Sequence, residues 1–325
     1  MDSYGRIVDY LRISVTDRCN ERCLYCMPEG YTGWESKPDH LTAAEILRVA
    51  RVAVGLGFRK FRLTGGEPLV RRDVPGIVRE MARLPSLETI ALSTNGTRLA
   101  ALAQPLPAAG LRSVNISLDA LDPQIYRNVT GGDVNLVLAG IQAAMAAGFE
   151  SVKLNCVLMR GVNESEIWPL VLFAAEHGLP LRFVELMPLT STDVLTDENF
   201  LPVAEAKRLL AQKDELIPQP ERRLGNGPAK YYLLKNTGAT VGFIGALTND
   251  HFCDNCNKMR LTADGKIRPC LGNHVELDLR KTLRQHTDDD GALREVLATA
   301  LRLKPFAHQF RENYTPCRPM TAIGG

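Results

Sequence analysis

The chain has 325 residues, 45% of them hydrophobic, which is enough for one large or two ordinary domains with a buried core. A net charge of +2 and an aromatic content of 6% give no overall electrostatic footprint for nucleic acid. No run of 18 apolar residues and no basic-then-apolar leader occurs, so we expect a cytoplasmic protein that does not enter a membrane.

Stretches rich in β-branched residues alternate with helical patterns through the first two thirds of the chain. The predicted strands cover residues 9–16, 59–64, 88–94, 112–118, 151–157 and 180–186. Helices are expected from Thr42, which opens a capping box, from about Val74, from Thr97, over 134–147, after caps at Asn163 and Glu166, and over 203–212. Six β/α units predict an all-parallel sheet with outer helices, either a partial barrel or a doubly wound sheet.

The pattern changes between residues 214 and 230, where prolines, glycines and charges accumulate. This composition indicates a domain boundary or an ordered crossing loop. Beyond it, residues 230–235 and 240–245 predict a strand pair, and residues 292–303 predict a helix. We therefore predict two domains, residues 1–215 and a smaller α+β unit of residues 216–325.

Most of the eight cysteines fall into two groups, which suggests metal ligands in a reducing compartment rather than a disulfide framework. Cys19, Cys23 and Cys26 form a CxxxCxxC triplet. Tetrahedral zinc usually takes four protein ligands, or three and a water, whereas a cubane iron–sulfur cluster is normally held by four cysteines. Three thiolates would leave one iron open to another ligand. A structural zinc site or a chance grouping remains the alternative.

The second group is a Cx2Cx13C triplet of Cys253, Cys256 and Cys270. Two triplets make six ligands, which two four-cysteine zinc sites could not share evenly. Cys156 lies in an apolar predicted strand, so we expect it to be a core residue. Cys317 lies close to the end of the chain, and we expect it not to be a ligand.

An aromatic residue, Tyr25, precedes the last cysteine of the first triplet, and this motif resembles the radical S-adenosylmethionine (SAM) family. In that family the open iron of a 4Fe-4S cluster binds SAM. A Gly-Gly-Glu-Pro motif follows the second strand, as in the family, where the glycines let the backbone approach the ligand. The resemblance implies a cluster on Cys19, Cys23 and Cys26, and SAM contacts at Tyr25, Gly65, Gly66, Glu67, Thr94, Ser117 and Met187, with Asp119 beside them. Hydroxyls at strand ends are also common helix caps.

The likeness continues along the chain, through residues 11–20, 65–73, 182–187, 252–256, 260–265 and the closing Ile-Gly-Gly. These segments resemble the radical SAM proteins that cyclise GTP in the first step of molybdenum cofactor biosynthesis. The resemblance implies a partial β/α barrel with the SAM cluster and, across a cavity, a second 4Fe-4S cluster on Cys253, Cys256 and Cys270 that binds guanine. The implied product is (8S)-3′,8-cyclo-7,8-dihydroguanosine 5′-triphosphate.

No GxxxxGK[ST] loop occurs, so side chains would have to hold a triphosphate. The resemblance implies GTP contacts at Arg12, Arg62, Arg71, Lys153, Arg182, Lys258 and Arg260. Lys258 stands where the family has an arginine, and it keeps the charge but lacks the planar fork. Catalytic roles are implied for Lys258 and Arg260, one of which would supply hydrogen to the last radical. They are implied as well for Gly324 and Gly325, although terminal glycines are otherwise usually frayed.

The resemblance also implies an electron donor such as a flavodoxin or ferredoxin, a downstream cyclic pyranopterin monophosphate synthase and a homodimer. Two alternatives remain open. One is a radical SAM peptide-modifying enzyme with an auxiliary cluster, although such enzymes usually carry more cysteines. The other is a non-catalytic interaction module that binds zinc or an iron–sulfur cluster.

Overall fold

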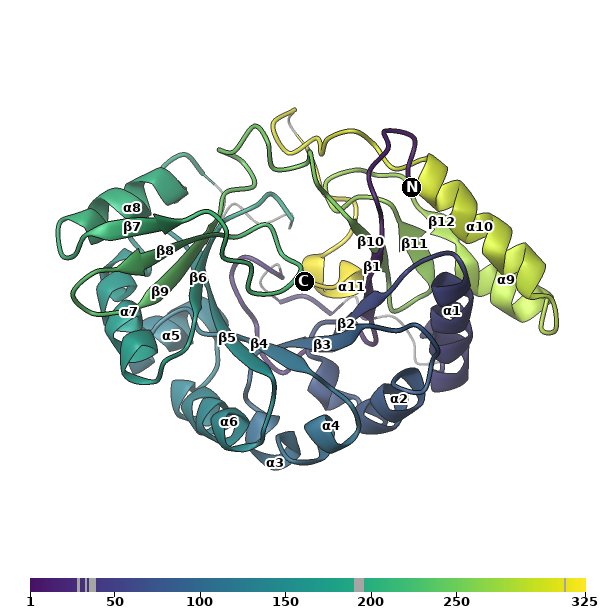
Figure 1. Ribbon diagram of the computed structural model, residues 1–325, viewed down its shortest axis with the longest axis horizontal. Coiled ribbons are helices and arrows are strands. Elements are labelled where there is room, and N and C mark those ends of the chain that lie inside the picture. Colours follow the sequence, from purple (N-terminus) through teal and green to yellow (C-terminus); the bar gives the residue numbers. More distant parts are fainter. Residues whose placement is uncertain (28–29, 33, 35–38, 190–195, 313) are drawn as a thin grey trace.

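One curved sheet organises the protein. The computed structural model describes residues 1–27, 30–32, 34, 39–189, 196–312 and 314–325. Its strands pair in the order β12-β11-β10-β1-β2-β3-β4-β5-β6-β9-β8-β7. The central strands run parallel and confirm the six predicted ones: β1 (Tyr10–Ser14), β2 (Lys60–Thr64), β3 (Thr89–Thr94), β4 (Ser113–Ser117), β5 (Ser151–Leu158) and β6 (Leu181–Glu185). The sheet is curved, and the helices other than the short C-terminal one lie on its outer side, so the fold is a partial barrel (Figure 1).

The outer helices follow the strands in alternation. They are α1 (Ala43–Gly55), α2 (Val74–Met81), α3 (Leu99–Leu102), α4 (Pro105–Ala108), α5 (Pro123–Thr130), α6 (Val134–Ala146), α7 (Ile167–Glu176) and α8 (Val203–Ala211), with short 3-10 turns η2 (Pro68–Val70) and η3 (Glu164–Glu166). The capping box of α1 is confirmed, since the backbone N–H of Glu45 donates to the Thr42 hydroxyl at 3.2 Å and that of Thr42 to the Glu45 carboxylate at 2.8 Å.

Three local expectations were wrong. Asn163 and Glu166 stand at the N-cap positions of η3 and α7, but neither side chain makes a capping hydrogen bond. The Asn163 amide donates to the carbonyls of Asp119 and Val157, and the Glu166 carboxylate accepts from Leu121 and Asp122 N–H. The helix from Thr97 is two short helices, because prolines at the second one cannot continue the hydrogen bonding of the first. Helix α5 was not predicted, although Asp122 caps it in front of a proline at its first position.

The C-terminal part extends the sheet at both ends. It contributes β7 (Leu216–Gln219), β8 (Lys230–Leu234), β9 (Thr240–Ile244), β10 (Lys258–Leu261), β11 (Lys266–Arg268), β12 (Leu277–Asp278), α9 (Leu279–Gln285), α10 (Asp290–Arg302) and α11 (Met320–Ile323). Strand β9 runs parallel to β6, and β10 runs parallel to β1. The predicted strand pair is β8 and β9, whereas the expected loop begins with a strand, β7. A division at residue 215 stays a prediction, since one sheet contains strands from both sides of it.

Along the strands, side chains that pack into the hydrophobic core alternate with side chains that face the inside of the barrel. On β1, Leu11 and Ile13 are fully buried in the hydrophobic core, and on β2 Phe61 and Leu63 are the corresponding residues. Because successive side chains of a strand point to opposite faces, the residues between them face the inside of the barrel. The inward face therefore carries the polar side chains considered below. No helix in the described part of the chain is long and apolar enough to cross a membrane.

Candidate active site

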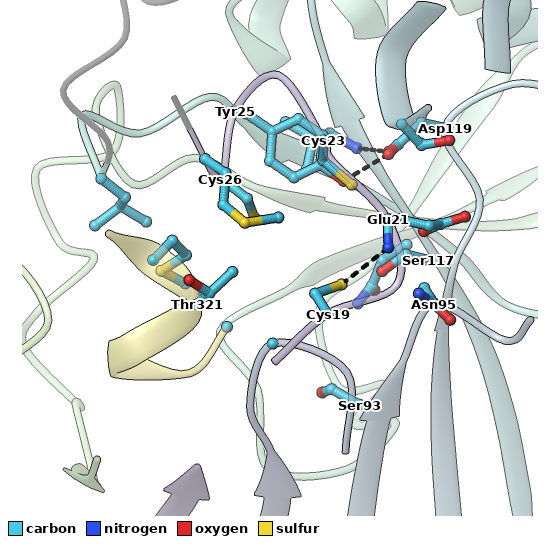
Figure 2. A pocket seen from close by; sticks show the side chains of 18 of the residues that line it. Cys19, Glu21, Cys23, Tyr25, Cys26, Ser93, Asn95, Ser117, Asp119 and Thr321 are labelled. Carbon is cyan, nitrogen blue, oxygen red and sulfur yellow. Dashed lines mark hydrogen bonds between the residues drawn. The ribbon is translucent and has the colours of Figure 1, made fainter. Parts of the chain in front are cut away.

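A cavity of about 220 Å³ lies at the carboxyl ends of the parallel strands, where loops of such sheets converge (Figure 2). The three cysteines of the first triplet line it. Six of the seven side chains or glycines predicted to contact SAM also line it: Tyr25, Gly65, Gly66, Thr94, Ser117 and Met187. Sequence reasoning missed Glu21, Asn95, Tyr126, Asn155 and Glu185, which are further lining residues.

The glycines after β2 lie close to the chain's own backbone, and their expected approach to SAM stays a prediction. A Cβ atom at Gly66 would lie 2.4 Å from the carbonyl oxygens of Asp17 and Arg18, and one at Gly65 would lie 2.4 Å from that of Thr16. The N–H groups of Gly66 and Glu67 donate to Thr16 and Arg18 at 2.8 Å each. The close approach is thus to the chain's own backbone, and it fixes the loop that leads into the first cysteines.

Glu67 lies beneath this loop and does not line the cavity. Its fully buried carboxylate accepts hydrogen bonds from Leu69 N–H at 2.9 Å, the Thr94 hydroxyl at 2.7 Å and Asn95 N–H at 2.7 Å. Burial raises its pKa to about 7. Glu67 therefore joins the ends of β2 and β3, and its contact with SAM stays a prediction.

Buried carboxylates surround the first triplet. The Tyr25 hydroxyl donates to Asp119 at 2.6 Å, and the Tyr126 hydroxyl donates to Glu21 at 2.8 Å. Burial raises the pKa of Asp119 to about 6 and that of Glu21 to about 7. Burial, with Glu67 and Glu21 nearby, raises the pKa of Cys19 to about 12. Three thiols around one cavity fit an iron–sulfur cluster. Iron binds thiolates, so each of these thiols would lose its proton when the cluster binds.

The second triplet occupies a more cationic setting. Cys253 and Cys256 precede β10, and Cys270 follows β11. Burial raises the pKa of Cys253 and Cys270. Burial also works to raise the pKa of Cys256, but the ammonium groups of Lys304 and Lys258 bring it below its usual value. At Cys256 these ammonium groups therefore favour the thiolate, the form that a cluster binds. Among described residues, no three His, Cys, Asp or Glu side chains are arranged to hold a single metal ion.

Buried and partly buried cations gather on the inner face of the sheet. Arg12 on β1 lies in register with Arg260 on β10 and with Arg62 on β2, and neighbouring strands are about 4.8 Å apart. Burial lowers the pKa of Arg12 well below its usual value and those of Arg182 and Arg260 to about 10. We call Arg12, Arg62, Lys153, Arg182, Lys258 and Arg260 the cationic patch.

Some of these cations have unused donors. Within the described chain, Nε of Arg12 and both Nε and Nη2 of Arg182 are buried without a hydrogen-bond partner. An unpaired buried charge is costly, so the patch calls for an anionic ligand. Burial, then Arg182 and Arg62, lowers the pKa of Lys153 to about 8.

Several of the predicted GTP contacts have protein partners, and Arg62, for example, donates to the Tyr10 hydroxyl and to the Leu92 carbonyl. Arg71 forms an ion pair with Asp73 at 2.7 Å and donates to the carbonyls of Val15 and Leu41 at 2.8 and 2.9 Å. Its role in GTP binding stays a prediction. Nζ of Lys258 donates to the Asn257 side chain at 2.9 Å and lies 5.7 Å from the centre of the Tyr10 ring.

The C-terminal segment lies inside the barrel (Figure 1). The carbonyl of Gly325 accepts from the Thr64 hydroxyl at 2.6 Å and from Arg12, and that of Gly324 accepts from Arg260. Gly324 has φ +88°, and a Cβ there would lie 2.9 Å from Ser14 and Thr64 side chains. Gly325 lines the cavity as well, so this segment joins the cavity to the cationic patch.

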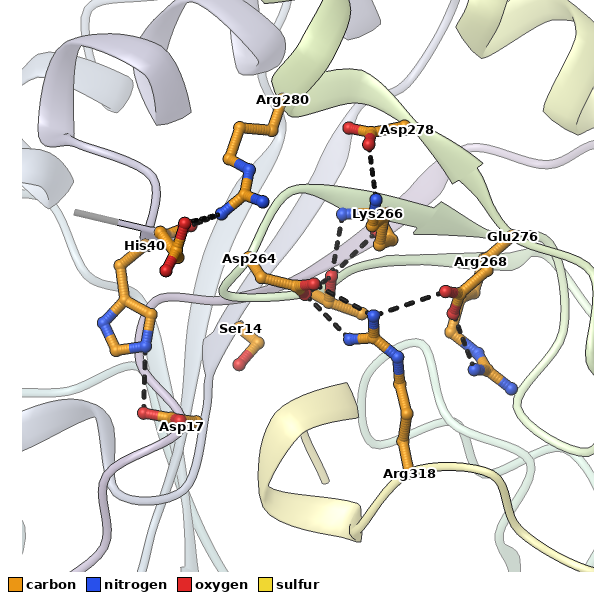
Figure 3. Close-up of polar contacts among 12 residues, drawn as sticks. Ser14, Asp17, His40, Asp264, Lys266, Arg268, Glu276, Asp278, Arg280 and Arg318 are labelled. Carbon is orange, nitrogen blue, oxygen red and sulfur yellow. Dashed lines mark hydrogen bonds and ion pairs between the residues drawn. The ribbon is translucent and has the colours of Figure 1, made fainter. Parts of the chain in front are cut away.

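An ion-pair network anchors that segment upstream. The Arg318 guanidinium donates to both carboxylate oxygens of Asp264 at 2.9 Å and lies 3.3 Å from Glu276 (Figure 3). Glu276 also pairs with the fully buried Arg268 at 3.0 Å. A bidentate pair has a fixed geometry, so Arg318 sets where α11 enters the barrel. Of the two remaining cysteines, Cys156 is fully buried in the core, as expected, and Cys317 is exposed, so that its not being a ligand stays a prediction.

Comparison with known families divides the chain in two. The Radical SAM superfamily matches residues 13–174, and Molybdenum Cofactor Synthesis C matches residues 179–310. A GTP 3′,8-cyclase of Moorella thermoacetica is 45% identical over 325 residues, which cover 100% of this chain and 99% of that protein. One of Petrotoga mobilis is 40% identical over 332 residues, which cover both chains completely.

Solved structures share the fold. SuiB of Streptococcus suis bound to precursor peptide SuiA has a TM-score of 0.64 at 16% identity, over 89% of this chain and 66% of that one. Native anSMEcpe with bound AdoMet has a TM-score of 0.60 at 16% identity, over 93% of this chain and 82% of that one. At such identities the likeness concerns the fold alone. The full-length sequence relatives carry the assignment: the chain belongs to the GTP 3′,8-cyclase family of radical SAM proteins.

Proposed function

We infer that this chain uses SAM and two 4Fe-4S clusters to convert GTP to (8S)-3′,8-cyclo-7,8-dihydroguanosine 5′-triphosphate, the first step of molybdenum cofactor biosynthesis. One observation supports this most directly. A cavity lined by three cysteines adjoins a patch of buried cations with unused donors, and a second cysteine triplet flanks that patch. Full-length relatives at 40% and 45% identity favour this reading over a peptide-modifying enzyme or a non-catalytic module.

The proposed roles follow the cavity and the patch. Cys19, Cys23 and Cys26 would hold a cluster that would supply the electron for reductive cleavage of SAM, and the protein would bind GTP so that its C3′ could lose hydrogen to the 5′-deoxyadenosyl group and bond to C8. Cys253, Cys256 and Cys270 would hold the guanine-binding cluster. The protein fixes C3′ near the radical source and keeps out water.

The cationic patch would hold the GTP. Arg182 and Lys153 stand on neighbouring strands with Arg62 close by, and their charges suit a triphosphate. Lys258 and Arg260 lie at the end of the patch nearest the second triplet. We assign to one of these two the proton that the last radical takes up together with one electron from the external donor, and to Gly324 and Gly325 a part in the productive use of the radical.

The proposal extends to partners and location. A low-potential electron donor such as a flavodoxin or ferredoxin would feed the first cluster, and a cyclic pyranopterin monophosphate synthase would consume the product. A homodimer and a cytoplasmic location belong to the proposal as well. Eight free cysteines support a reducing compartment.

The test is an anaerobic reaction of the reconstituted, reduced protein with SAM and GTP, followed by mass spectrometry. We expect 5′-deoxyadenosine and an isomer of GTP in equal amounts, with about eight irons and matching sulfide per chain. A Cys156→Ala variant serves as the matched cysteine control and should behave like the parent. Two zincs without sulfide, or no SAM cleavage, would overturn the proposal.

A further inference from the structure

Lys304 is a buried cation that the proposed reaction does not use. It follows α10 and is 2% exposed. Its Nζ donates to the carbonyl of Lys258 at 2.7 Å, to the carbonyl of Pro269 at 2.9 Å and to Sγ of Cys256 at 3.5 Å. An ammonium group has three donors, so all three are used. None of these acceptors is a carboxylate, and the sulfur is the one that becomes an anion when it binds iron.

The two carbonyls belong to the segments that carry the second triplet. Lys258 begins β10, two residues after Cys256, and Pro269 directly precedes Cys270. One ammonium group thus ties together two segments from different loops, each next to a cysteine. Lys258 cannot serve the same purpose, because its own Nζ points to Asn257 and the Tyr10 ring.

We propose that Lys304 is a positioning residue of the C-terminal cluster, which holds Cys256 and Cys270 at their spacing and makes the cluster's reduction potential more positive. The potential of an iron–sulfur cluster depends on its net charge and on hydrogen bonds to its sulfurs. Residues that touch a ligand, and not the metal, commonly tune a site in this way. A buried ammonium on a cysteine sulfur stabilises the reduced, more negative cluster, because water screens their attraction poorly there.

The first triplet offers the internal contrast. Cys19 accepts a hydrogen bond from the backbone N–H of Glu21 at 3.4 Å, and its charged neighbours include Glu67 and Glu21. If Lys304 acts as proposed, the two clusters of one chain have different potentials, and the C-terminal one is reduced more easily. This inference rests on the proposed function in one respect, that the second triplet carries a cluster.

The experiment compares Lys304→Met, which removes the charge and the donors at similar length, with Lys304→Arg, which keeps the charge. Lys207→Met is the matched control, since Lys207 is a partly buried lysine that contacts Tyr232 and no cysteine. Each is prepared as full-length, reconstituted protein. Iron and sulfide are counted, and both clusters are titrated electrochemically with electron paramagnetic resonance as the readout.

For Lys304→Met we expect the oxidised-to-reduced ratio of the second cluster at fixed potential to rise about tenfold, a shift of about 59 mV to more negative potential for one electron. The first cluster, the Arg variant and the Lys207 control should stay near the parent. Loss of the second cluster alone in the Met variant, with the first intact, would support the positioning role, and Lys304→Gln then tests the charge. Full iron and an unchanged potential in both neutral variants overturn the proposal. A parent protein without a second cluster would instead refute the proposed function.

Discussion

The two cysteine triplets sit in opposite electrostatic surroundings. Glu21, Glu67 and Asp119 lie around the first, whereas Lys258 and Lys304 lie against the second. In a poorly solvated cavity such charges act over several ångströms. Negative side chains suit the positively charged SAM that the proposal places beside the first triplet, and the ammonium groups suit the negatively charged cluster that it places at the second.

The loss of one ligand of the first triplet should have the largest effect on activity. We expect Cys23→Ala to abolish SAM cleavage, because a three-thiolate site has no spare ligand. The measurement is 5′-deoxyadenosine released from reduced protein, with Cys156→Ala as the control for loss of a buried thiol. Substantial 5′-deoxyadenosine from Cys23→Ala would refute the assignment of the first triplet.

Cys256→Ala should affect the second triplet alone. The first cluster and its bound SAM should remain, while GTP binding through guanine is lost. Iron content, SAM binding and GTP binding by calorimetry separate the two effects. GTP affinity equal to that of the parent would count against the second cluster as a substrate site.

Deleting Gly324 and Gly325 should uncouple SAM cleavage from the cyclisation of GTP. The carbonyls of both residues bind cationic-patch arginines, and Gly325 also binds Thr64. We expect unchanged thermal midpoint and iron content but strongly reduced cyclised product per SAM cleaved. Full product yield from the truncated chain would return these residues to the frayed-terminus reading.

Arg182→Ala tests the cationic patch, and its effect should be smaller. Losing charge-assisted bonds of roughly 1.5–3 kcal/mol should weaken GTP binding by about ten- to a hundredfold and leave guanosine nearly unaffected. Arg112→Ala, which removes an exposed pair with Glu150, is the control. Because two Arg182 donors lack partners, ligand-free Arg182→Ala should have a free energy of unfolding no lower than that of the ligand-free parent. Equal losses for GTP and guanosine would make Arg182 structural.

The smallest effect concerns pH. The pKa of Lys153 is lowered to about 8 by burial and by Arg182 and Arg62. The lysine is protonated below that pH and neutral above it, so GTP affinity should be constant below pH 8 and fall as pH rises. The same depression means that protonation opposes folding, so stability gains as pH rises from about 8 toward the unfolded value. GTP titrations from pH 6.5 to 9.5 should show this fall in the parent and lose it in Lys153→Met.

Much of this arrangement could be predicted because it is local. The six parallel strands, the capping box at Thr42 and both cysteine triplets follow from period, cap chemistry and spacing. Sequence could not reveal that Gly65 and Gly66 accommodate the backbone of residues 16–18, since that depends on two loops meeting. It likewise missed Tyr126 and Glu21, which meet through a hydrogen bond across 105 positions. The contacts of Lys304 could not be predicted either, because a single lysine after a helix forms no recognisable sequence pattern.

The position of β1 has a consequence for folding. One neighbour of β1 is β2, but the other is β10, and Tyr10 N–H donates to Asn257 at 3.1 Å. Pairings between distant parts of a chain close large loops and slow folding. During synthesis, β1 and the cysteines just after it must wait for most of the chain before their second neighbour exists. One edge of β1 therefore stays unpaired until the C-terminal strands have been made.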